Sequence, residues 1–433
     1  MSNEFSRRNF IKAVGAGAAA AATPLVLSGC AMEPAAPPKP VGRVIVIGAG
    51  YGGATAAKYV RMWSDRRIEV FLIDRSAQFV SCPLSNLVLG GSRTLESLTM
   101  GYEKLREYGV QVIRDEVTGV NFERKRVQLK RIEDLPYDRL VVAPGIDFMY
   151  EEIPGLNNPE AQIVVLSAWK AGPETVALRK QLEAMPDGGV YILSMPLAPY
   201  RCPPGPYERV CQVAHYLKQS KPRSKVILLD GNPDIVSKKG LFVAAWNDLY
   251  KGIIEYRPNQ VAKDVDVKGM SVKTEFDSFK GNVLNVVPPQ KAGLIAQQAK
   301  LITANNRWCG VNWQTMESVA APGVYVLGDA TLSAAAMPKS ASMANNHAKI
   351  AASAIVAAMT GQPINPAPTI NNTCYSYVSD REAMHVDSVH RWDAGKKTLE
   401  PVAGAGGVSA QRSELEKQYA DAWARNIWAD TLA

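Results

Sequence analysis

The six cysteines of this 433-residue chain are its most reactive side chains: Cys30, Cys82, Cys202, Cys211, Cys309 and Cys374. Cys202 belongs to the proline-rich stretch Arg201-Cys202-Pro203-Pro204-Gly205-Pro206-Tyr207-Glu208. Glu208, one helical turn or so further on, is a candidate base or proton carrier, although a surface glutamate at a helix start explains it nearly as well. The sequence alone does not show which cysteines form a disulfide. In an oxidising compartment a purely structural disulfide is the obvious alternative to a redox role for these cysteines.

The four histidines, His215, His347, His385 and His390, have no metal-ligand spacing. No C-x-x-C-H haem attachment site is present in the sequence. We therefore expect no metal centre and no haem on this chain, so that any haem would belong to another chain.

A dinucleotide-binding turn is predicted at Gly48-Ala49-Gly50-Tyr51-Gly52-Gly53, because it follows the apolar run 44–47 and precedes a helical pattern at 54–60. In such a turn Gly48 makes the bend, Gly50 lets the backbone approach a pyrophosphate and Gly53 lets the helix pack against the strand. The helix N-terminus offers free N–H groups to the phosphates. A second strand, 68–73, ends at Asp74, whose carboxylate can accept hydrogen bonds from ribose hydroxyls.

Composition indicates an ordinary globular chain, with 47% hydrophobic and 21% charged residues. The net charge of +8 is scattered and not gathered in aromatic-interleaved stripes, which argues against nucleic acid as a partner. A mildly basic surface suits an acidic partner or an anionic substrate instead.

The first thirty residues are predicted to be a twin-arginine export signal, because Ser6-Arg7-Arg8-Asn9-Phe10-Ile11-Lys12 precedes a weakly apolar stretch. That stretch is too short for a transmembrane helix, which needs about 20 residues. The chain is therefore expected in a periplasm. Leu27-Ser28-Gly29-Cys30 resembles a lipoprotein processing site, and lipidation at Cys30 and plain cleavage nearby remain equal alternatives. The Pro- and Ala-rich residues that follow are expected to form a linker.

A second α/β unit is predicted downstream, with strands at 189–194 and 225–230 and a helix at 207–219. In a nicotinamide-binding domain the turn after the first of these strands carries closely spaced glycines. Here residues 195–206 contain five prolines, which donate no N–H and fix φ. The unit is therefore predicted to keep the fold of a dinucleotide domain without its nucleotide site.

The chain is predicted to return to its first domain at a strand ending in Gly328-Asp329. Lys339 precedes a helix at 341–359 and is expected to face the cofactor ring, with a solvated lysine as the alternative. The aromatic residues of a helix at 414–430 are more simply core than a cofactor site. The predicted fold class is α/β, with two Rossmann-like dinucleotide-binding-type domains, the first discontinuous, and a small C-terminal α+β domain. The predicted boundaries are 1–30 signal, 31–41 linker, 42–155 with 290–362 first domain, 156–289 second domain and 363–433 C-terminal domain.

Several of these segments resemble one family, the flavoprotein subunit of flavocytochrome c sulfide dehydrogenase, within the glutathione-reductase-like FAD proteins. They are the glycine turn, Cys82-Pro83-Leu84-Ser85-Asn86, Ala168-Trp169-Lys170-Ala171-Gly172, the proline-rich cysteine stretch, Gly328-Asp329, Met337-Pro338-Lys339-Ser340 and Asn372-Thr373-Cys374-Tyr375-Ser376. The resemblance runs from about residue 42 to the C-terminus. Sulfide:quinone oxidoreductases are relatives of this family.

The resemblance implies a covalent thioether between Cys82 and the 8α-methyl carbon of FAD, and a redox disulfide between Cys202 and Cys374 beside the flavin. It implies that hydrosulfide opens this disulfide, that sulfide leaves as zero-valent sulfur or polysulfide, and that electrons pass through FAD to a cytochrome c subunit, in a heterodimer. The catalytic candidates are Cys202, Cys374 and Glu208. The cofactor-binding candidates are Gly48, Gly50, Gly53, Asp74, Cys82, Gly145, Trp169, Gly328, Asp329 and Lys339. Cys211 and Cys309 are expected to be packed free thiols.

Three other functions are compatible with parts of the sequence. A sulfide:quinone oxidoreductase would require a membrane-binding C-terminus, and the last helix carries Trp423 and Trp428 but no obvious membrane plane. A non-catalytic flavoprotein partner of a sulfur-oxidising complex would bind tightly without reacting with sulfide. A nicotinamide-dependent disulfide reductase is disfavoured by the proline-rich loop.

Overall fold

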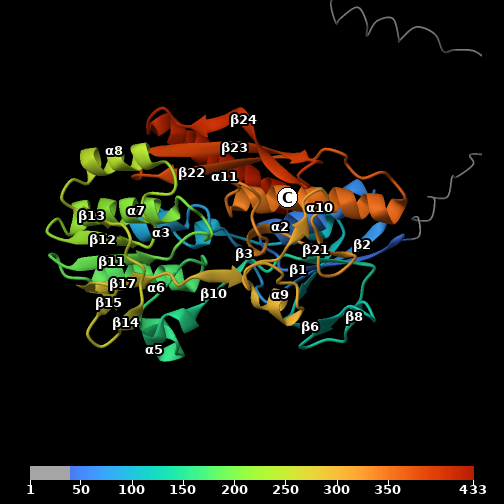
Figure 1. The fold of residues 1–433 in the computed structure, drawn as a ribbon, viewed down its shortest axis with the longest axis horizontal. Coiled ribbons are helices and arrows are strands. Elements are labelled where there is room, and N and C mark those ends of the chain that lie inside the picture. The colour runs from blue at the N-terminus through green and yellow to red at the C-terminus, as the bar shows by residue number, and fades with distance from the viewer. Residues whose placement is uncertain (1–39) are drawn as a thin grey trace, which may run out of the picture. The chain divides into compact units, whose positions relative to one another are not determined.

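A computed structural model describes residues 40–433. The predicted export signal, the lipidation of Cys30 and the linker as far as residue 39 lie outside the described residues. No helix within 40–433 is long and apolar enough to cross a membrane. The predicted α/β fold class is confirmed by two separate sheets, one largely and one entirely parallel, each flanked by helices (Figure 1).

The first sheet has seven strands, and its parallel part is built around the strand that leads into the glycine turn. Its strands in spatial order are β19 (Val311–Asn312), β20 (Glu317–Ser318), β21 (Val324–Val326), β9 (Arg139–Val142), β1 (Gly42–Ile47), β2 (Ile68–Asp74) and β5 (Val110–Arg114). Ile47 of β1 pairs with Ile73 of β2 in parallel register. The glycine turn and Asp74 therefore emerge side by side at the carboxyl edge, where open α/β sheets bind their ligands.

Two helices with many small residues cover this sheet, α2 (Tyr51–Trp63) and α10 (Ala341–Thr360). Gly52, Gly53 and Ala56 of α2 are buried, which lets the helix lie close to the sheet and to α10. Residues 311–360 thus complete the sheet and helices that residues 42–148 begin. Shorter helical segments that accompany this sheet include α4 (Glu103–Glu107), α9 (Leu294–Gln298) and the 3-10 turn η4 (Gly328–Ala330).

The second sheet has four parallel strands in the order β13 (Ile254–Arg257), β12 (Lys225–Asp230), β11 (Val190–Met195) and β17 (Val283–Val286). Its helices are α5 (Pro159–Val164), α6 (Pro173–Ala184), α7 (Gly205–Ser220) and α8 (Lys239–Leu249). The proline-rich loop joins the end of β11 to α7. Helix α7 begins two residues before the predicted Tyr207, because Pro206 fits the first turn of a helix.

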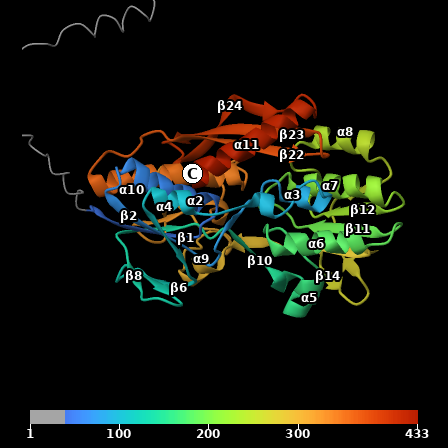
Figure 2. The same ribbon diagram turned by 180° about the vertical axis from the view of Figure 1, so that it is seen from behind.

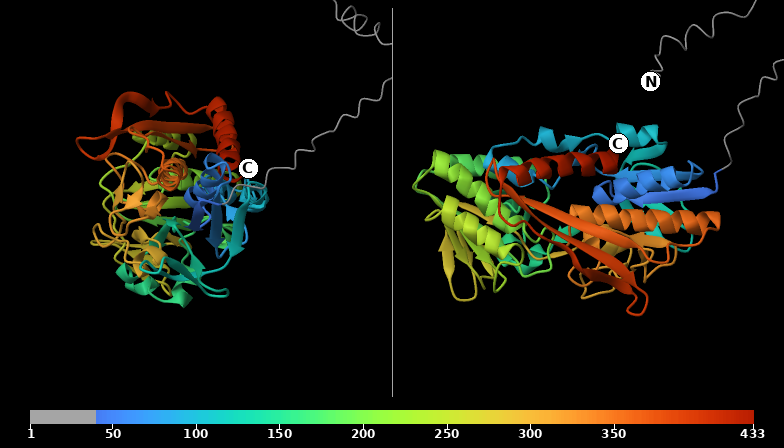
Figure 3. Two further views of the ribbon diagram at one scale, coloured as in Figure 1. Left: turned by 90° about the vertical axis from the view of Figure 1, so that its right-hand side faces the viewer. Right: turned by 90° about the horizontal axis from the view of Figure 1, so that it is seen from above.

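The C-terminal part lies over both sheets (Figures 1 and 2). It consists of the antiparallel sheet β22 (Thr369–Tyr377), β23 (Ala383–Asp393) and β24 (Thr398–Val408), with helix α11 (Glu414–Leu432). Strand β22 contacts α10 of the first unit and α7 of the second. Figure 3, seen from above, shows these strands running from one unit toward the other. Residues of β22 are therefore placed between the two units.

Smaller elements complete the fold. The two-stranded sheets are β10 (Ile146–Phe148) with β18 (Gln290–Ala292), and β3 (Phe79–Val80) with β4 (Thr99–Met100). The three-stranded sheets are β6 (Val117–Asn121), β7 (Arg126–Leu129) and β8 (Leu135–Pro136), and β14 (Asp264–Asp266), β15 (Ser271–Lys273) and β16 (Ser278–Lys280). Helix α3 (Ser85–Gly90) and the 3-10 turns η1 (Glu96–Leu98), η2 (Tyr150–Glu152) and η3 (Pro154–Leu156) lie between them in sequence. The predicted domain boundaries stay a prediction, because residues Pro40–Ala433 pack together as a single compact body without a division at those boundaries.

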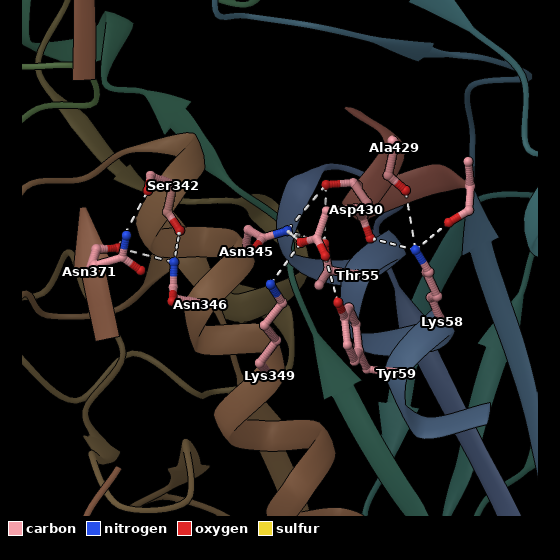
Figure 4. A network of polar contacts seen from close by, with 12 residues as sticks. Thr55, Lys58, Tyr59, Ser342, Asn345, Asn346, Lys349, Asn371, Ala429 and Asp430 are labelled. Atoms are coloured by element: carbon pink, nitrogen blue, oxygen red, sulfur yellow. Dashed lines mark hydrogen bonds and ion pairs between the residues drawn. The ribbon is translucent and has the colours of Figure 1, made fainter. Parts of the chain in front are cut away.

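A polar network holds the end of α11 against α2 and α10 (Figure 4). The carboxylate of Asp430 accepts hydrogen bonds from Asn345 at 2.7 Å and Tyr59 at 2.5 Å, and pairs with Lys349 at 2.8 Å. The side-chain nitrogen of Lys58 donates to the last backbone carbonyls of α11, those of Ala429 and Asp430 among them. A lysine at this position hydrogen-bonds to the last carbonyls of a helix, where the following turn no longer supplies every N–H donor.

Candidate functional site

The glycine turn has the geometry of a phosphate-binding turn. Gly48 has φ +92°, and a Cβ there would lie 2.4 Å from the carbonyl oxygen of Ala143. A Cβ on Gly53 would lie 1.7 Å from the carbonyl oxygen of Gly48, so only glycine lets α2 approach the strand. Gly50 has open space where its Cβ would be and lines the cavity described below.

Asp74 lies directly behind this turn. One carboxylate oxygen accepts a hydrogen bond from the N–H of Ala49 at 2.7 Å, and the other accepts one from the N–H of Ser76 at 2.7 Å. Asp74 does not line the cavity. The structure therefore places it as a support for the glycine turn, and its predicted contact with a ribose stays a prediction.

A single cavity brings together predicted site residues from distant parts of the chain. It opens along the carboxyl edge of the first sheet, between the glycine turn, α3, the start of α7, η4, β22 and α11. Nine of the predicted site residues line it, six of which carry a side chain: Cys82, Trp169, Cys202, Glu208, Asp329 and Cys374. Gly50, Gly145 and Gly328 line it as well.

The residues around this cavity fit a flavin dinucleotide. One carboxylate oxygen of Asp329 is buried and has no hydrogen-bond partner among the described residues, so it can accept from a ribitol hydroxyl. Burial raises the pKa of Asp329, and the guanidinium of Arg201, 4.0 Å away, lowers it. Gly145 has φ +64° and open space where its Cβ would be, which leaves room for a ring to lie against the backbone.

Cys202 is held by backbone contacts next to the first turn of α7. It has φ +63°, its N–H donates to the carbonyl of Lys339 at 2.8 Å, and its own carbonyl accepts from the N–H of Gly205 at 2.9 Å. A Cβ on Gly205 would lie 2.9 Å from the Cys202 Sγ and 2.9 Å from the ring of Trp169. Because residue 205 is glycine, the thiol of Cys202 has room beside the N-terminus of α7, where the helix dipole is positive.

Cys374 approaches the same cavity from β22, and its Sγ donates to Oδ1 of Asn372 at 3.4 Å. Both thiols are free in the structure. Burial raises the pKa of each, and each is close enough to Glu208 for the carboxylate to raise it further. The positive charge of Lys238 lowers the pKa of both thiols.

Glu208 is buried and joins three segments at the cavity. Its Oε1 accepts from the N–H of Tyr377 in β22 at 3.0 Å, and its Oε2 accepts from Asn86 Nδ2 in α3 at 3.0 Å. Burial raises its pKa, although the hydrogen bonds from Tyr377 and Asn86 lower it. The alternative interpretation of Glu208 as a surface residue is wrong, because Glu208 is only 7% exposed and lines the cavity.

Lys238 is a site residue that the sequence analysis missed. It precedes α8 with φ +53° and is buried, and its Nζ donates to the carbonyl oxygen of Cys374 at 2.9 Å and to Ser376 Oγ at 2.8 Å. Burial lowers its pKa to about 8. No motif surrounds Lys238, so only its placement against β22 reveals it.

Arg209 was also missed. It is buried, stacks 4.5 Å from the centre of the Trp169 ring and donates to Asn86 Oδ1 at 2.9 Å and to the carbonyl of Ala168 at 2.7 Å. Trp169 itself donates from Nε1 to the carbonyl of Arg201 at 2.9 Å. These contacts fix the predicted Trp169 segment to the proline-rich loop and to α3.

Lys339, which was expected to face the flavin ring, instead bonds to the turn that follows β21. Its Nζ donates to the carbonyls of Asp329 at 3.0 Å and Thr331 at 2.5 Å and lies 3.7 Å from the centre of the Trp308 ring. Lys339 does not line the cavity that holds the three cysteines, and it is buried, so the alternative of a solvated lysine is wrong too. A buried ammonium needs acceptors, and the nearest ones belong to the turn after β21.

The aromatic residues of α11 divide into different environments. Trp423 lines the cavity and lies 6.0 Å from the ring of Tyr375, whereas Tyr419 is 51% exposed. Trp428 donates to Tyr51 and to Ser81, next to Cys82. The prediction of a plain core stripe is therefore wrong for the exposed Tyr419, whereas Trp423 packs against the core and lines the cavity as well.

The carboxyl edge of the second sheet is filled with the protein's own side chains. Asp230 ends β12, where a dinucleotide domain presents an acid to a ribose, but it is fully buried and accepts from Tyr207 at 2.8 Å and Tyr256 at 3.2 Å. Asn232 bonds its other oxygen at 2.8 Å. These contacts agree with a second unit that lacks a nucleotide site. Cys211 and Cys309 are buried free thiols, as predicted.

The fold and the cavity define a flavin-dependent oxidoreductase, and the family model for pyridine nucleotide-disulphide oxidoreductases matches residues 42–171. The model for the central part of the sulfide dehydrogenase (flavocytochrome c) flavoprotein chain matches 175–288, and that for flavocytochrome c sulphide dehydrogenase, flavin-binding, matches 366–432. The chain belongs to this family of sulfide dehydrogenase flavoprotein chains, as the sequence predicted. A twin-arginine signal model matches residues 4–24, which supports export to the periplasm.

Individual relatives agree with this assignment. The chain is 50% identical over 46 residues to the sulfide dehydrogenase (flavocytochrome c) flavoprotein chain of Chlorobaculum thiosulfatiphilum, which is 94% of that sequence and 11% of this chain. It is 24% identical over 339 residues to the mitochondrial sulfide:quinone oxidoreductase of Dictyostelium discoideum, covering 76% of this chain and 73% of that one. The solved sulfide:quinone oxidoreductase of Aquifex aeolicus shares the fold, with a TM-score of 0.73, 16% identity and coverage of 90% and 91%.

Proposed function

We propose that this flavoprotein oxidises sulfide to zero-valent sulfur through a disulfide between Cys202 and Cys374, beside an FAD bound covalently at Cys82, and passes electrons to a cytochrome c subunit. The observation that carries this proposal is the meeting of these three cysteines in one cavity, although they come from the α3, α7 and β22 segments. Hydrosulfide is small enough to reach a buried sulfur, and thiol–disulfide exchange is the reaction that such a pair performs.

In the proposed reaction hydrosulfide attacks one sulfur of the disulfide. A new S–S bond forms on that cysteine, the Cys202–Cys374 bond breaks, and the other cysteine leaves as a thiolate. The first turn of α7 favours a thiolate on Cys202, and Lys238 favours one on Cys374. Glu208 lies close to both sulfurs, and its raised pKa suits a group that takes up and returns the proton of hydrosulfide.

FAD supplies an acceptor for two electrons that can leave one at a time, which suits a haem as the next carrier. The residues that would hold it are the glycine turn at the pyrophosphate, Asp329 at the ribitol and Cys82 at the ring. Cys82 lies on the cavity wall between β3 and α3, with Ser81 fixed by Tyr51 and Trp428. A covalent bond there would keep the cofactor on a protein that works outside the cytoplasm.

A cytochrome subunit is proposed because the family's name includes one and this chain lacks the sequence of a haem attachment site. Lipidation of Cys30 would add a membrane anchor and stays a prediction. The alternative acceptor is a quinone, which the relatives named sulfide:quinone oxidoreductase favour. Reduction of added quinone in the absence of cytochrome would support that alternative.

The test is anaerobic addition of sulfide to the purified flavoprotein while the visible absorbance of the flavin is recorded. Bleaching is expected in the wild type and is expected to be lost in Cys202→Ser and Cys374→Ser. Cys211→Ser is the matched control, because Cys211 is a buried free thiol outside the cavity. A wild-type flavin that stays oxidised would contradict the proposal and favour a non-catalytic partner protein. Bleaching that survives both substitutions would remove the disulfide from it.

A further inference from the structure

Asn86 is a buried polar residue of the cavity and lies on α3, four residues after Cys82. Glu208 and Arg209, both near the start of α7, line the same cavity. Helix α3 packs against α6 and α7, and Leu87, next to Asn86, is buried. This packing holds the side-chain amide of Asn86 between the segment of Cys82 and the first turns of α7.

The orientation of the Asn86 amide is fixed from two sides. The Nε of Arg209 can only donate, and it donates to Oδ1 of Asn86 at 2.9 Å. The backbone carbonyl oxygen of Gly205 can only accept, and it accepts from Nδ2 of Asn86 at 3.4 Å. A flipped amide would lose both contacts. The second N–H of Nδ2 therefore faces Glu208, whose Oε2 accepts it at 3.0 Å.

Arg209, which sets this orientation, is itself held in place by neutral groups. It is buried, and its terminal nitrogens donate to the carbonyl oxygen of Ala168 at 2.7 Å and to Oδ1 of Asn285 at 2.9 Å. Its guanidinium carbon lies 4.5 Å from the centre of the Trp169 ring. Asn285 belongs to β17, so the second sheet holds Arg209 in place, and Arg209 in turn holds Asn86.

Both carboxylate oxygens of Glu208 face N–H donors. Oε1 accepts from the backbone N–H of Tyr377 at 3.0 Å, and Oε2 accepts from Asn86. Such donors stabilise a carboxylate more than a protonated carboxyl group. Burial raises the pKa of Glu208, and the hydrogen bonds from Tyr377 and Asn86 oppose this effect. Asn86 therefore supplies one of the contacts that keep a buried carboxylate ionised.

Charged and titratable groups of the surrounding elements act on Glu208 as well. Besides burial and the two hydrogen bonds, the positive charges of Lys238 and Arg209 lower its pKa. Burial raises the pKa of the groups that face Glu208 from the other elements, and the Glu208 carboxylate raises it further: Cys202, Cys211, Cys374 and Tyr377. These groups stay in place when Asn86 is replaced, so a change in the titration of Glu208 reports the hydrogen bond from Asn86.

We propose that Asn86 is a positioning residue for sulfide oxidation, which holds Glu208 as a carboxylate beside Cys202 and Cys374 so that it takes up the proton of hydrosulfide. The proposal rests on the function proposed above. In this step the sulfur of hydrosulfide forms an S–S bond with one cysteine, and the Cys202–Cys374 bond breaks with its electron pair on the other sulfur. The S–H proton moves to a lone pair of Glu208 that no N–H donor occupies.

Two substitutions separate the contact with Glu208 from the contact with Arg209. Asn86→Asp keeps an oxygen for Arg209 and replaces the donor that faces Glu208 with a second oxygen, whereas Asn86→Leu removes both contacts. Asn282→Asp is the matched control, because the exposed Asn282 accepts from the N–H of Val190 at 2.9 Å and does not line the cavity.

Infrared difference spectroscopy of the flavin-loaded protein follows the C=O band of the protonated Glu208 carboxyl group as the pH is changed. Loss of this band in Glu208→Gln assigns it. In Asn86→Asp the two carboxyl groups titrate as a pair, so the first protonation of the pair is compared with that of Glu208 in the wild type. Stopped-flow absorbance then gives the rate of flavin reduction by sulfide across the same pH range.

Protonation is expected at a higher pH in both Asn86 variants than in the wild type and Asn282→Asp. Flavin reduction in Asn86→Asp is expected to be at least about tenfold slower on the acid side of the Glu208 titration and less than about twofold slower on its alkaline side, where the carboxylate is ionised in every variant. An unchanged titration in Asn86→Asp, or a loss of rate that is equal at every pH, would overturn the proposal. A wild-type flavin that sulfide does not reduce would instead refute the proposed sulfide oxidation, while the infrared titration still tests the contact between Asn86 and Glu208.

Discussion

Lys238 donates a hydrogen bond from its buried side-chain nitrogen to the carbonyl oxygen of Cys374, across 2.9 Å. The ammonium group therefore lies beside a reactive thiol without an ion-pair partner of its own among the salt bridges of the described residues. Its second contact is the neutral hydroxyl of Ser376. This arrangement leaves the positive charge available to a thiolate that forms on Cys374.

Replacing Lys238 with Met is expected to raise the pKa of the Cys374 thiol, because the nearby positive charge favours the ionised form of the thiol. Lys238→Arg keeps the charge and is the matched control. The measurement is the pH dependence of alkylation of Cys374 in the reduced protein. An unchanged thiol pKa in Lys238→Met would show that the lysine is only structural.

Gly205→Ala is expected to slow the reduction of the flavin by sulfide about tenfold to a hundredfold, because the new methyl group must displace the Cys202 Sγ or the Trp169 ring. The flavin content should stay that of the wild type. Gly240→Ala is the control, since a Cβ there meets no atom within 4 Å. Stopped-flow absorbance of both variants gives the rates, and equal rates would mean that the Cys202 position is not constrained by Gly205.

Cys82→Ala is expected to convert the flavin from covalent to dissociable. After acid precipitation the wild-type protein should remain yellow, whereas the variant should release FAD that is measured by its fluorescence in the supernatant. Cys309→Ala removes a buried thiol that does not line the cavity and should behave as the wild type. Release of FAD from the wild type would contradict the covalent bond at Cys82.

Glycine spacing and strand ends were predictable because their causes are local. Gly48, Gly53 and Asp74 lie within one strand–turn–helix–strand unit, and the backbone geometry of that unit sets their roles. Cys202 and Cys374 could be related only through the family resemblance, since their meeting depends on how β22 is placed between two units. The proline-rich loop predicts a second unit without a nucleotide site, but it does not predict that Tyr207 and Tyr256 donate hydrogen bonds to Asp230.

Single charged residues were the least predictable. Lys238 has no motif around it, and its role follows from the packing of the segment before α8 against β22. Lys339 was expected at the flavin but bonds to the carbonyls after β21 instead, because a buried ammonium takes the nearest acceptors. Trp423 belongs to an apolar stripe of the kind that usually packs into a hydrophobic core. Its place in the cavity lining follows only from the position of α11 over that cavity.

Asp430→Asn is expected to lower the free energy of unfolding by about 1 kcal/mol near neutral pH, since the carboxylate binds Tyr59, Asn345 and Lys349. Burial raises the pKa of Asp430, but these three groups together lower it below its ordinary value. The stabilisation is therefore fully present above the unfolded pKa of about 4 and is lost as the pH falls through the lower folded value.

The measurement is urea unfolding of the flavin-loaded protein near neutral pH and at about pH 3, below the unfolded pKa. Asp277→Asn is the control, because the exposed carboxylate of Asp277 makes no hydrogen bond among the described residues. A difference between wild type and Asp430→Asn that stays constant with pH would contradict this role of the network.

The most direct test of the disulfide at the centre of this account is a peptide map of the oxidised, exported protein. The protein is alkylated in acid without reductant, and its cysteine peptides are identified by mass spectrometry. The account predicts one cross-linked pair that contains Cys202 and Cys374, with Cys211 and Cys309 free, and loss of this pair on stoichiometric addition of sulfide. Free thiols at both Cys202 and Cys374, or a bond from either one to another cysteine, would contradict it.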